Sequence, residues 1–127
     1  MQIDNECVRE ILFTIEEETT FDKGWHMMGA VSSCRRLEKY KGTGKVPYHV
    51  RYLEMKNMIY LPDKKIPDTY DLTPDGHEFL ANIREDNNWK KIKGISSNIG
   101  FASLKAISAI AEGVASAAIN KQLGFSE

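Results

Sequence analysis

The first hydrophobic pattern along the chain has the spacing of a helix face. Between residues 4 and 18, apolar positions recur three and four apart, which predicts a helix over this stretch. The residues on its apolar face are Cys7, Val8, Ile11, Leu12 and Ile15. Asp4 is placed to cap the helix N-terminus, and the turn residues at 22–24 end it.

The stretch from residue 25 to residue 42 predicts no single element. Trp25, Met27 and Met28 are large apolar side chains that we expect to be buried. Residues 29–37 fit either a strand or a short helix that begins at Ser33, and the pattern does not decide between the two.

A second clear helix is predicted for residues 45–56. Its apolar face consists of Val46, Val50 and Leu53. Pro47 suits the first turn of a helix, where its missing N–H costs nothing, so the helix is expected to begin near Gly44 or Lys45. Asn57 suits the left-handed position that closes a helix.

Two short strands are predicted next, at residues 58–61 and 69–72, joined by the turn residues 62–67. Thr73 is a suitable N-cap and Pro74 suits the first helical position, so a further helix is expected to follow the hairpin. We expect this helix to end before Lys93. Its apolar side comprises Phe79, Leu80, Ile83 and Trp89.

A last helix is predicted after residues 97–98, and Gly124 closes it. Its apolar bulk is supplied by Ile99, Leu104, Ile107, Ile110, Val114 and Leu123. Ala109, Gly113 and Ala117 stand four residues apart, and small side chains at this spacing let another helix approach closely. This ridge predicts either tight docking within the chain or a homodimer formed through the C-terminal helix.

The predicted order is therefore helix, unassigned segment, helix, hairpin, helix, helix. A helix that leads directly into a two-stranded hairpin is the order of a winged helix-turn-helix, whose recognition helix enters the major groove of DNA. We expect an α+β fold: a winged helix-turn-helix with a two-stranded wing and additional C-terminal helices. The expected domains are a winged-helix domain at residues 1–93 and a C-terminal helix at residues 94–127, packed on it or used for self-association.

Composition indicates the size of the core and the cellular compartment. The 127 residues, 42% hydrophobic and 28% charged, are enough for one globular core. Cys7 and Cys34 make no disulfide framework and are expected to be buried, reduced thiols. The acidic start differs from a secretory signal, and Lys105 and Glu112 interrupt the most apolar stretch. We therefore expect a cytoplasmic protein without a membrane partner.

The charge distribution says more than the net charge of −1. Residues 1–20 have a local charge of −5, whereas residues 35–56 have a local charge of +5. Basic charge concentrated in one segment is a footprint for a polyanion. It is equally compatible with a solvated face, and charge alone leaves both interpretations open.

Two stretches resemble known families. Residues 46–53, Val-Pro-Tyr-His-Val-Arg-Tyr-Leu, followed by Asn57, Met58 and Ile59, resemble the end of the recognition helix in bacterial winged-helix transcriptional regulators. Those regulators commonly have Ser where this chain has Pro47, and Gly where it has Asn57. The second change is mild because Asn tolerates the left-handed conformation. The first removes a hydroxyl that could donate to phosphate.

Residues 72–80, Leu-Thr-Pro-Asp-Gly-His-Glu-Phe-Leu, continue with Ile83, Arg84 and Asp86 and then with residues 89–93. They resemble a small winged-helix family of phage and prophage proteins of unknown function, which carries a Thr-x-x-Gly-His-Glu-Phe-Leu signature. The resemblance covers most of the chain except about residues 25–42. It implies a bacterial or phage cytoplasm and brings no known activity.

Enzymatic and metal chemistry find little support. His26, His49 and His77 lie on separate predicted elements, without the close ligand pairs of a zinc site, so no metal is expected. We expect His49 to pack or hydrogen-bond at its helix. Residues 42–45 lack the spacing of a phosphate-binding loop and predict a turn. We expect neither an enzyme nor a cofactor.

Two functions remain. The first is binding of duplex DNA as a regulator. The side chains expected to contact DNA are Arg35, Arg36, Lys41, Lys45, Tyr48, Arg51, Tyr52, Lys56, Lys64 and Lys65. The second is a protein-interaction module that binds and modulates or inhibits a host protein, for example a defence protein, because a fold alone does not fix function.

Overall fold

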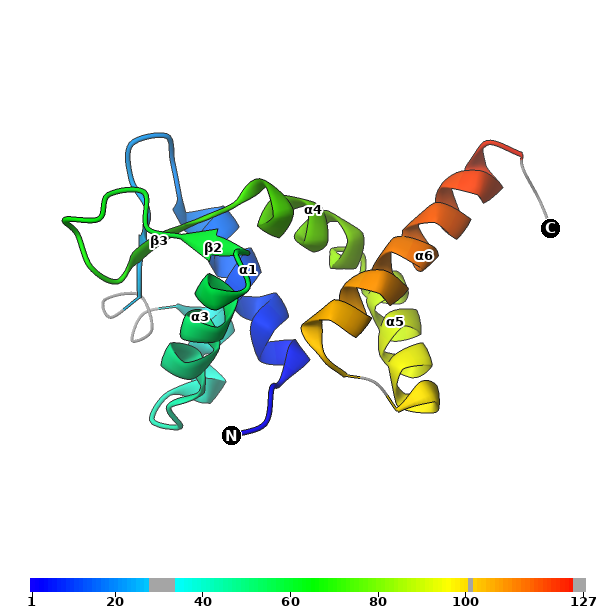
Figure 1. Ribbon diagram of the computed structural model, residues 1–127, viewed down its shortest axis with the longest axis horizontal. Helices are drawn as coiled ribbons and strands as arrows, with labels where there is room; N and C mark the ends of the chain where they lie inside the picture. Colours follow the sequence, from blue (N-terminus) through cyan, green and yellow to red (C-terminus); the bar gives the residue numbers. More distant parts are fainter. Residues whose placement is uncertain (28–33, 101, 125–127) are drawn as a thin grey trace. The chain divides into compact units, whose positions relative to one another are not determined.

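The computed structural model describes residues 1–27, 34–100 and 102–124. Its helices are α1 (Asn5–Glu18), the 3-10 helix η1 (Arg35–Tyr40), α3 (Lys45–Met55), α4 (Pro74–Ile83), α5 (Asp86–Ile99) and α6 (Leu104–Gln122). Its strands are β1 (Trp25–His26), β2 (Ile59–Tyr60) and β3 (Thr69–Leu72). The fold is α+β, as expected, and divides into two compact units, Met1–His77 and Glu78–Glu127 (Figure 1).

Unit 1 (Met1–His77) contains a small antiparallel sheet in the order β1-β3-β2. Ile59 lies opposite Leu72, and Trp25 lies opposite Tyr70. These four side chains are buried, so one face of the sheet belongs to the core. The predicted hairpin is confirmed, and a third strand comes from the stretch that the sequence left unassigned.

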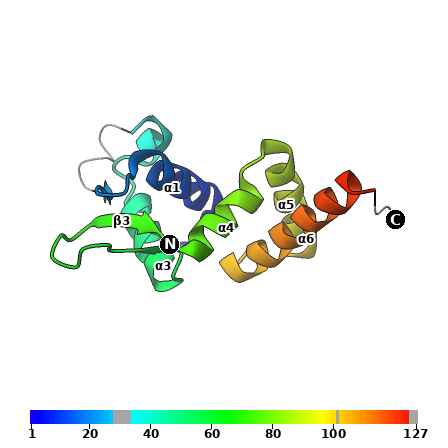
Figure 2. The ribbon, with the colours of Figure 1, turned by 90° about the horizontal axis from the view of Figure 1, so that it is seen from above.

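Helix α1 packs against α3, η1, β1 and β3 (Figure 2 shows α1 and α3 from above). Its five predicted face residues are all buried, and so are Phe13 and Thr14. The Asp4 side chain accepts hydrogen bonds from the backbone N–H groups of Glu6 and Cys7, which confirms it as the N-cap. Because α1 is covered over most of its circumference, it is the central element of unit 1.

The unassigned stretch has two outcomes. Trp25 and Met27 are buried, as expected, and a 3-10 helix occupies residues 35–40. Met28 and residues 29–33 lie outside the described residues. The expected burial of Met28 and the choice between a strand and a short helix from Ser33 therefore stay predictions.

The two cysteines differ. Both are free thiols, and Cys7 is fully buried, as predicted. Burial, together with the Asp4 carboxylate, raises the pKa of Cys7 to about 12. Full burial is wrong for Cys34, which is half-buried with its Sγ 3.5 Å from the Thr14 hydroxyl. Cys34 precedes η1 in the chain, at the rim of the core.

The backbone conformation at the helix ends agrees with the residues predicted to begin and end the helices. Helix α3 begins after Gly44, which has φ of 76°, and Asn57 after its end has φ of 60°. Both left-handed positions carry residues that tolerate them. Pro47 lies in the first turn of α3, and Pro74 is the first residue of α4, both as expected.

One predicted helix is wrong. Residues 74–92 form two helices, α4 and α5, because the chain leaves helical geometry at Glu85, whose side chain caps α5 by accepting from the Asn87 N–H. Lys93 and Gly94 lie inside α5, which runs on to Ile99. The domain boundary expected between residues 93 and 94 rested on a helix end before Lys93, which the structure does not have. The division into a domain at residues 1–93 and a helix at residues 94–127 stays a prediction.

Unit 2 (Glu78–Glu127) is built on α5 and α6, which pack against each other (Figure 1). Its buried apolar side chains are Phe79, Leu80, Ile83, Trp89, Ile92, Leu104, Ile107 and Ala111. The small residues Ala109, Gly113 and Ala117 are all exposed. Self-association through this ridge stays a prediction. Among the helices of the described ranges, none has the length and apolarity that crossing a bilayer requires.

Candidate nucleic-acid interface

Helix α3 presents a basic and aromatic face to solvent. Its buried side is formed by Val46, His49, Val50 and Leu53. At 100° per residue, Tyr48, Arg51 and Tyr52 fall on the other side, within an arc of about 100°, and Lys56 follows as the C-cap at the edge of this face. Arg51 and Lys56 are exposed, and the Arg51 guanidinium lies 5.3 Å from the centre of the Tyr48 ring. This contact preorganises one cation on the helix surface.

His49 fixes the position of α3 from its buried side. Its Nε2 accepts a hydrogen bond of 2.8 Å from the Asp4 backbone N–H, and its Nδ1 lies 2.7 Å from the Lys45 carbonyl oxygen. An acceptor at Nε2 and a donor at Nδ1 define one neutral tautomer. The expectation that His49 hydrogen-bonds at its helix is confirmed: the imidazole links α3 to the start of α1.

Lys45 reinforces the same junction. Its ammonium nitrogen lies 3.0 Å from the second carboxylate oxygen of Asp4, and both side chains are about two-thirds buried. Burial works to raise the pKa of Asp4, but hydrogen bonds from Lys45 and from two backbone N–H groups outweigh it and hold this pKa below 3.8. Lys45 therefore serves the contact between α1 and α3.

Arg36 also forms ion pairs within the chain. Its guanidinium donates to Glu17 at 2.7 Å and to Glu10 at 2.8 Å, and it lies 4.6 Å from the centre of the Phe13 ring. Hydrogen bonding to both carboxylates raises the pKa of Arg36 further above its usual range. The acidic N-terminal helix and the basic segment thus neutralise part of each other's charge, which the sequence could not reveal.

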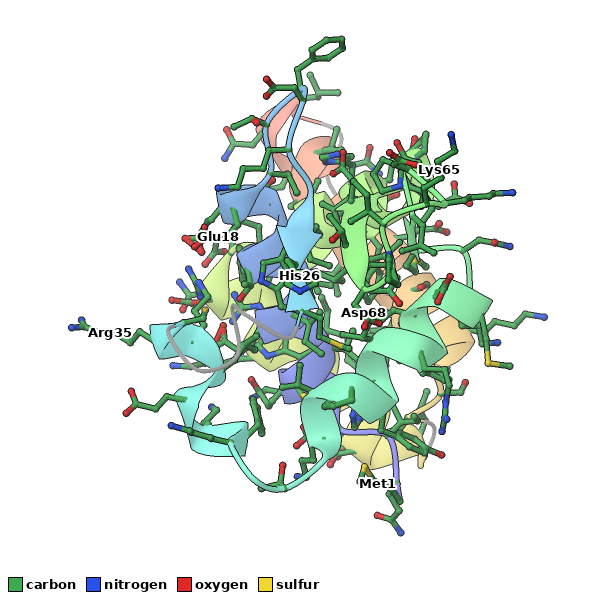
Figure 3. All side chains as sticks on the ribbon, turned by 90° about the vertical axis from the view of Figure 1, so that its left-hand side faces the viewer. Met1, Glu18, His26, Arg35, Lys65 and Asp68 are labelled. Atoms are coloured by element: carbon green, nitrogen blue, oxygen red, sulfur yellow. The ribbon has the colours of Figure 1, made fainter. Side chains whose placement is uncertain are left out.

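The remaining predicted cations point outward. Arg35 on η1, Lys41 after it, and Lys64 and Lys65 in the β2–β3 loop are all exposed. Figure 3 shows Arg35 extending from one side of unit 1 and Lys65 lying on the other side of the same view. The predicted contacts are therefore spread over unit 1 rather than forming one compact cluster.

The turn that joins the hairpin to α4 is held by Thr73. Its hydroxyl donates to the Asn57 carbonyl oxygen at 2.6 Å and accepts from the Gly76 N–H at 3.0 Å. Its own N–H donates to the Met58 carbonyl oxygen at 3.0 Å. The Thr and Gly of the Thr-x-x-Gly pattern thus serve the backbone, while His77 is exposed.

A metal ion needs several coordinating side chains close together in the fold. Within the described ranges, no three side chains of His, Cys, Asp or Glu stand close enough together to hold a metal ion. His26 on the exposed face of β1 is 3.0 Å from the Thr69 hydroxyl on β3. His26, His49 and His77 lie on β1, α3 and α4 respectively.

Fold and surface together define a small α+β protein with an exposed basic and aromatic helix. A family model matches residues 2–102, and the chain belongs to this family, which is described as "Hypothetical protein (DUF2513)". Neither a curated protein nor a solved structure matches the chain.

Proposed function

We propose that unit 1 is a winged-helix module that binds duplex DNA through α3. The order α1, β1, η1, α3, β2, β3 supports this assignment, with η1 and α3 as the helix-turn-helix and the β2–β3 hairpin as the wing. The sheet order β1-β3-β2 also supports it, because the hairpin strand β3 is the one that pairs with β1. The resemblance of residues 72–80 to phage and prophage proteins supports a phage or prophage setting.

The observation that carries the proposal is the exposed face of α3. A helix fits the major groove, where guanidinium groups recognise guanine and ammonium groups bind phosphate. In this proposal Arg51, held beside Tyr48, makes a base contact, and Lys56 at the helix end binds phosphate. Tyr52 lies between them on the same face.

The ion pairs refine the set of contact residues. A cation that already neutralises a carboxylate releases few counterions when it meets DNA. Arg36 and Lys45 therefore position η1 and α3 in this proposal. The side chains assigned to DNA are Arg35, Lys41, Tyr48, Arg51, Tyr52, Lys56, Lys64 and Lys65.

The test is a titration of fluorescent duplex DNA of mixed sequence at several salt concentrations, followed by anisotropy. Lys56→Ala should lower the salt slope by roughly one and weaken binding for every sequence. Arg51→Ala should also reduce discrimination between sequences, by about 1–3 kcal/mol. Lys91→Ala is the matched control, because Lys91 is exposed on α5. Wild-type protein that leaves the duplex unbound at low salt would refute the proposal.

A protein partner is the second candidate. It is favoured by the charge of unit 1, whose sequence has 11 basic and 13 acidic residues and therefore no excess of positive charge. A host protein bound by this module should be retained by immobilised full-length chain. Loss of retention in Arg51→Ala would locate that partner on α3, and retention by the same variant would place it elsewhere.

A further inference from the structure

A cleft of about 230 Å³ opens in unit 1 on the side of the sheet away from its core. One wall is the 20–24 turn between α1 and β1. The other is formed by β2, β3 and the loop that joins them. The cleft residues used below are Phe21, Asp22, Lys23, Tyr60, Asp63, Ile66 and Asp71. None of them is among the side chains assigned to DNA, although Lys64 and Lys65 lie in the same β2–β3 loop.

Three apolar side chains at this cleft are exposed. Phe21, at the tip of the 20–24 turn, has a relative exposure of 107%, and Tyr60 and Ile66 have 45% and 48%. The turn that carries Phe21 is closed by hydrogen bonds between the backbones of Thr20 and Lys23. A phenylalanine held in water on an ordered turn, with two further exposed apolar side chains lining the same cleft, is typical of a contact surface.

The charge of the cleft is negative. Asp22, Asp63 and Asp71 line it, with Lys23 as the cation among them. Each carboxylate uses one oxygen in a local hydrogen bond, to the Thr20 hydroxyl, the Lys65 N–H and the Leu72 N–H respectively. The second oxygens are left for an incoming donor.

We propose that this cleft binds an arginine side chain from a short segment of a partner protein. A planar guanidinium stacks on aromatic rings and donates to carboxylate oxygens, which matches Tyr60 beside Asp71 and Phe21 beside Asp22. The volume suits one large side chain and is below the usual range for small-molecule sites of about 300–1,000 Å³. The neighbouring apolar residues accommodate the flanking residues of the segment.

The experiment uses the full-length isotope-labelled chain and two peptides. One is acetyl-Leu-Arg-Leu-amide, and the other has citrulline, a neutral isostere, in place of arginine. The arginine peptide should shift the backbone amide resonances of both walls, residues 20–24 and 60–71. The citrulline peptide should bind at least about tenfold more weakly, because it lacks the charge that pairs with the carboxylates.

Asp71→Asn and Asp63→Asn remove charge but keep an amide oxygen for the local hydrogen bond, so both variants should fold. Each should weaken arginine-peptide binding about two- to fivefold. Asp75→Asn, an exposed residue at the start of α4, is the matched control and should bind normally. Phe21→Ser should weaken binding without changing the fold, because Phe21 is fully exposed.

Equal affinity for the two peptides, or unchanged affinity in Asp71→Asn and Asp63→Asn, would overturn the proposal. So would shifts at residues 20–24 and 60–71 that grow with protein concentration in the absence of peptide, because a second copy would then fill the cleft. The result is independent of DNA binding, since Arg51→Ala should leave the peptide affinity unchanged.

Discussion

Replacing Gly76 with alanine tests the tight turn between the hairpin and α4. A Cβ at this position would lie 2.0 Å from the carbonyl oxygen of Met58, and Cβ atoms in folded proteins essentially never come within 3.0 Å of a non-bonded atom. The obstacle is backbone, so no side-chain rotation relieves it. The start of α4 and the start of the hairpin would have to separate by about 1 Å.

The cost follows from the contacts at this turn. Overpacking of this kind costs about 1–3 kcal/mol. The separation also lengthens the hydrogen bonds from Thr73 to Met58 and to Asn57, now 3.0 and 2.6 Å, which contribute about 1 kcal/mol each. Alanine returns about 1 kcal/mol through its higher helix propensity. We expect Gly76→Ala to lower the free energy of unfolding by about 2–4 kcal/mol.

The assay is urea unfolding followed by circular dichroism. Gly94→Ala is the matched control, because Gly94 lies inside α5 with open space around its Cα, so alanine there should stabilise by up to about 1 kcal/mol. The two substitutions are chemically identical and should have opposite signs. A Gly76→Ala protein as stable as the wild type would refute the steric explanation of the Thr-x-x-Gly pattern.

Three further predictions concern charge and burial. Because the folded-state pKa of Asp4 is depressed, its stabilisation is present at neutral pH and is lost as pH falls through that pKa; acid unfolding of Asp4→Asn should therefore be less steep than that of the wild type. Arg36→Ala should lower the free energy of unfolding by about 1–3 kcal/mol and leave the salt slope of DNA binding unchanged. Arg35→Ala should lower the salt slope and leave the free energy of unfolding unchanged, and the same titration and urea curves measure both. Trp89→Ala should cost about 3–5 kcal/mol in urea unfolding, since Trp89 is buried, and a loss below 1 kcal/mol would contradict it.

The elements that could be predicted from the sequence are those with local signals. Asp4, Thr73 and Pro74 mark helix starts, and Asn57 marks a helix end, because each residue type satisfies a backbone requirement by itself. The apolar spacing of residues 7–15 identified the buried face of α1 for the same reason.

The elements that escaped prediction depend on distant partners or weak signals. Strand β1 has two residues, too few to alternate, and it exists through its pairing with β3. The break between α4 and α5 was missed because Trp89 was assigned to the apolar side of Phe79 and Ile83, although it lies six residues after Ile83, and because Glu85 is not among the preferred caps. Of the candidate site, the exposed positions on α3 could be predicted, whereas the ion pair between Arg36 and Glu17 joins residues 19 apart.

Asp4 joins three contacts in one residue: its N–H binds His49, one carboxylate oxygen caps α1, and the other pairs with Lys45. This has a practical consequence for labels and affinity tags. Removing residues 1–3 already converts the amide N–H of Asp4 into a terminal ammonium group, whereas removing Asp4 as well deletes all three groups and loosens α1 and α3 at once. A fusion partner at this end should therefore be attached through a flexible linker that keeps residues 1–3 and puts no tension on Asp4.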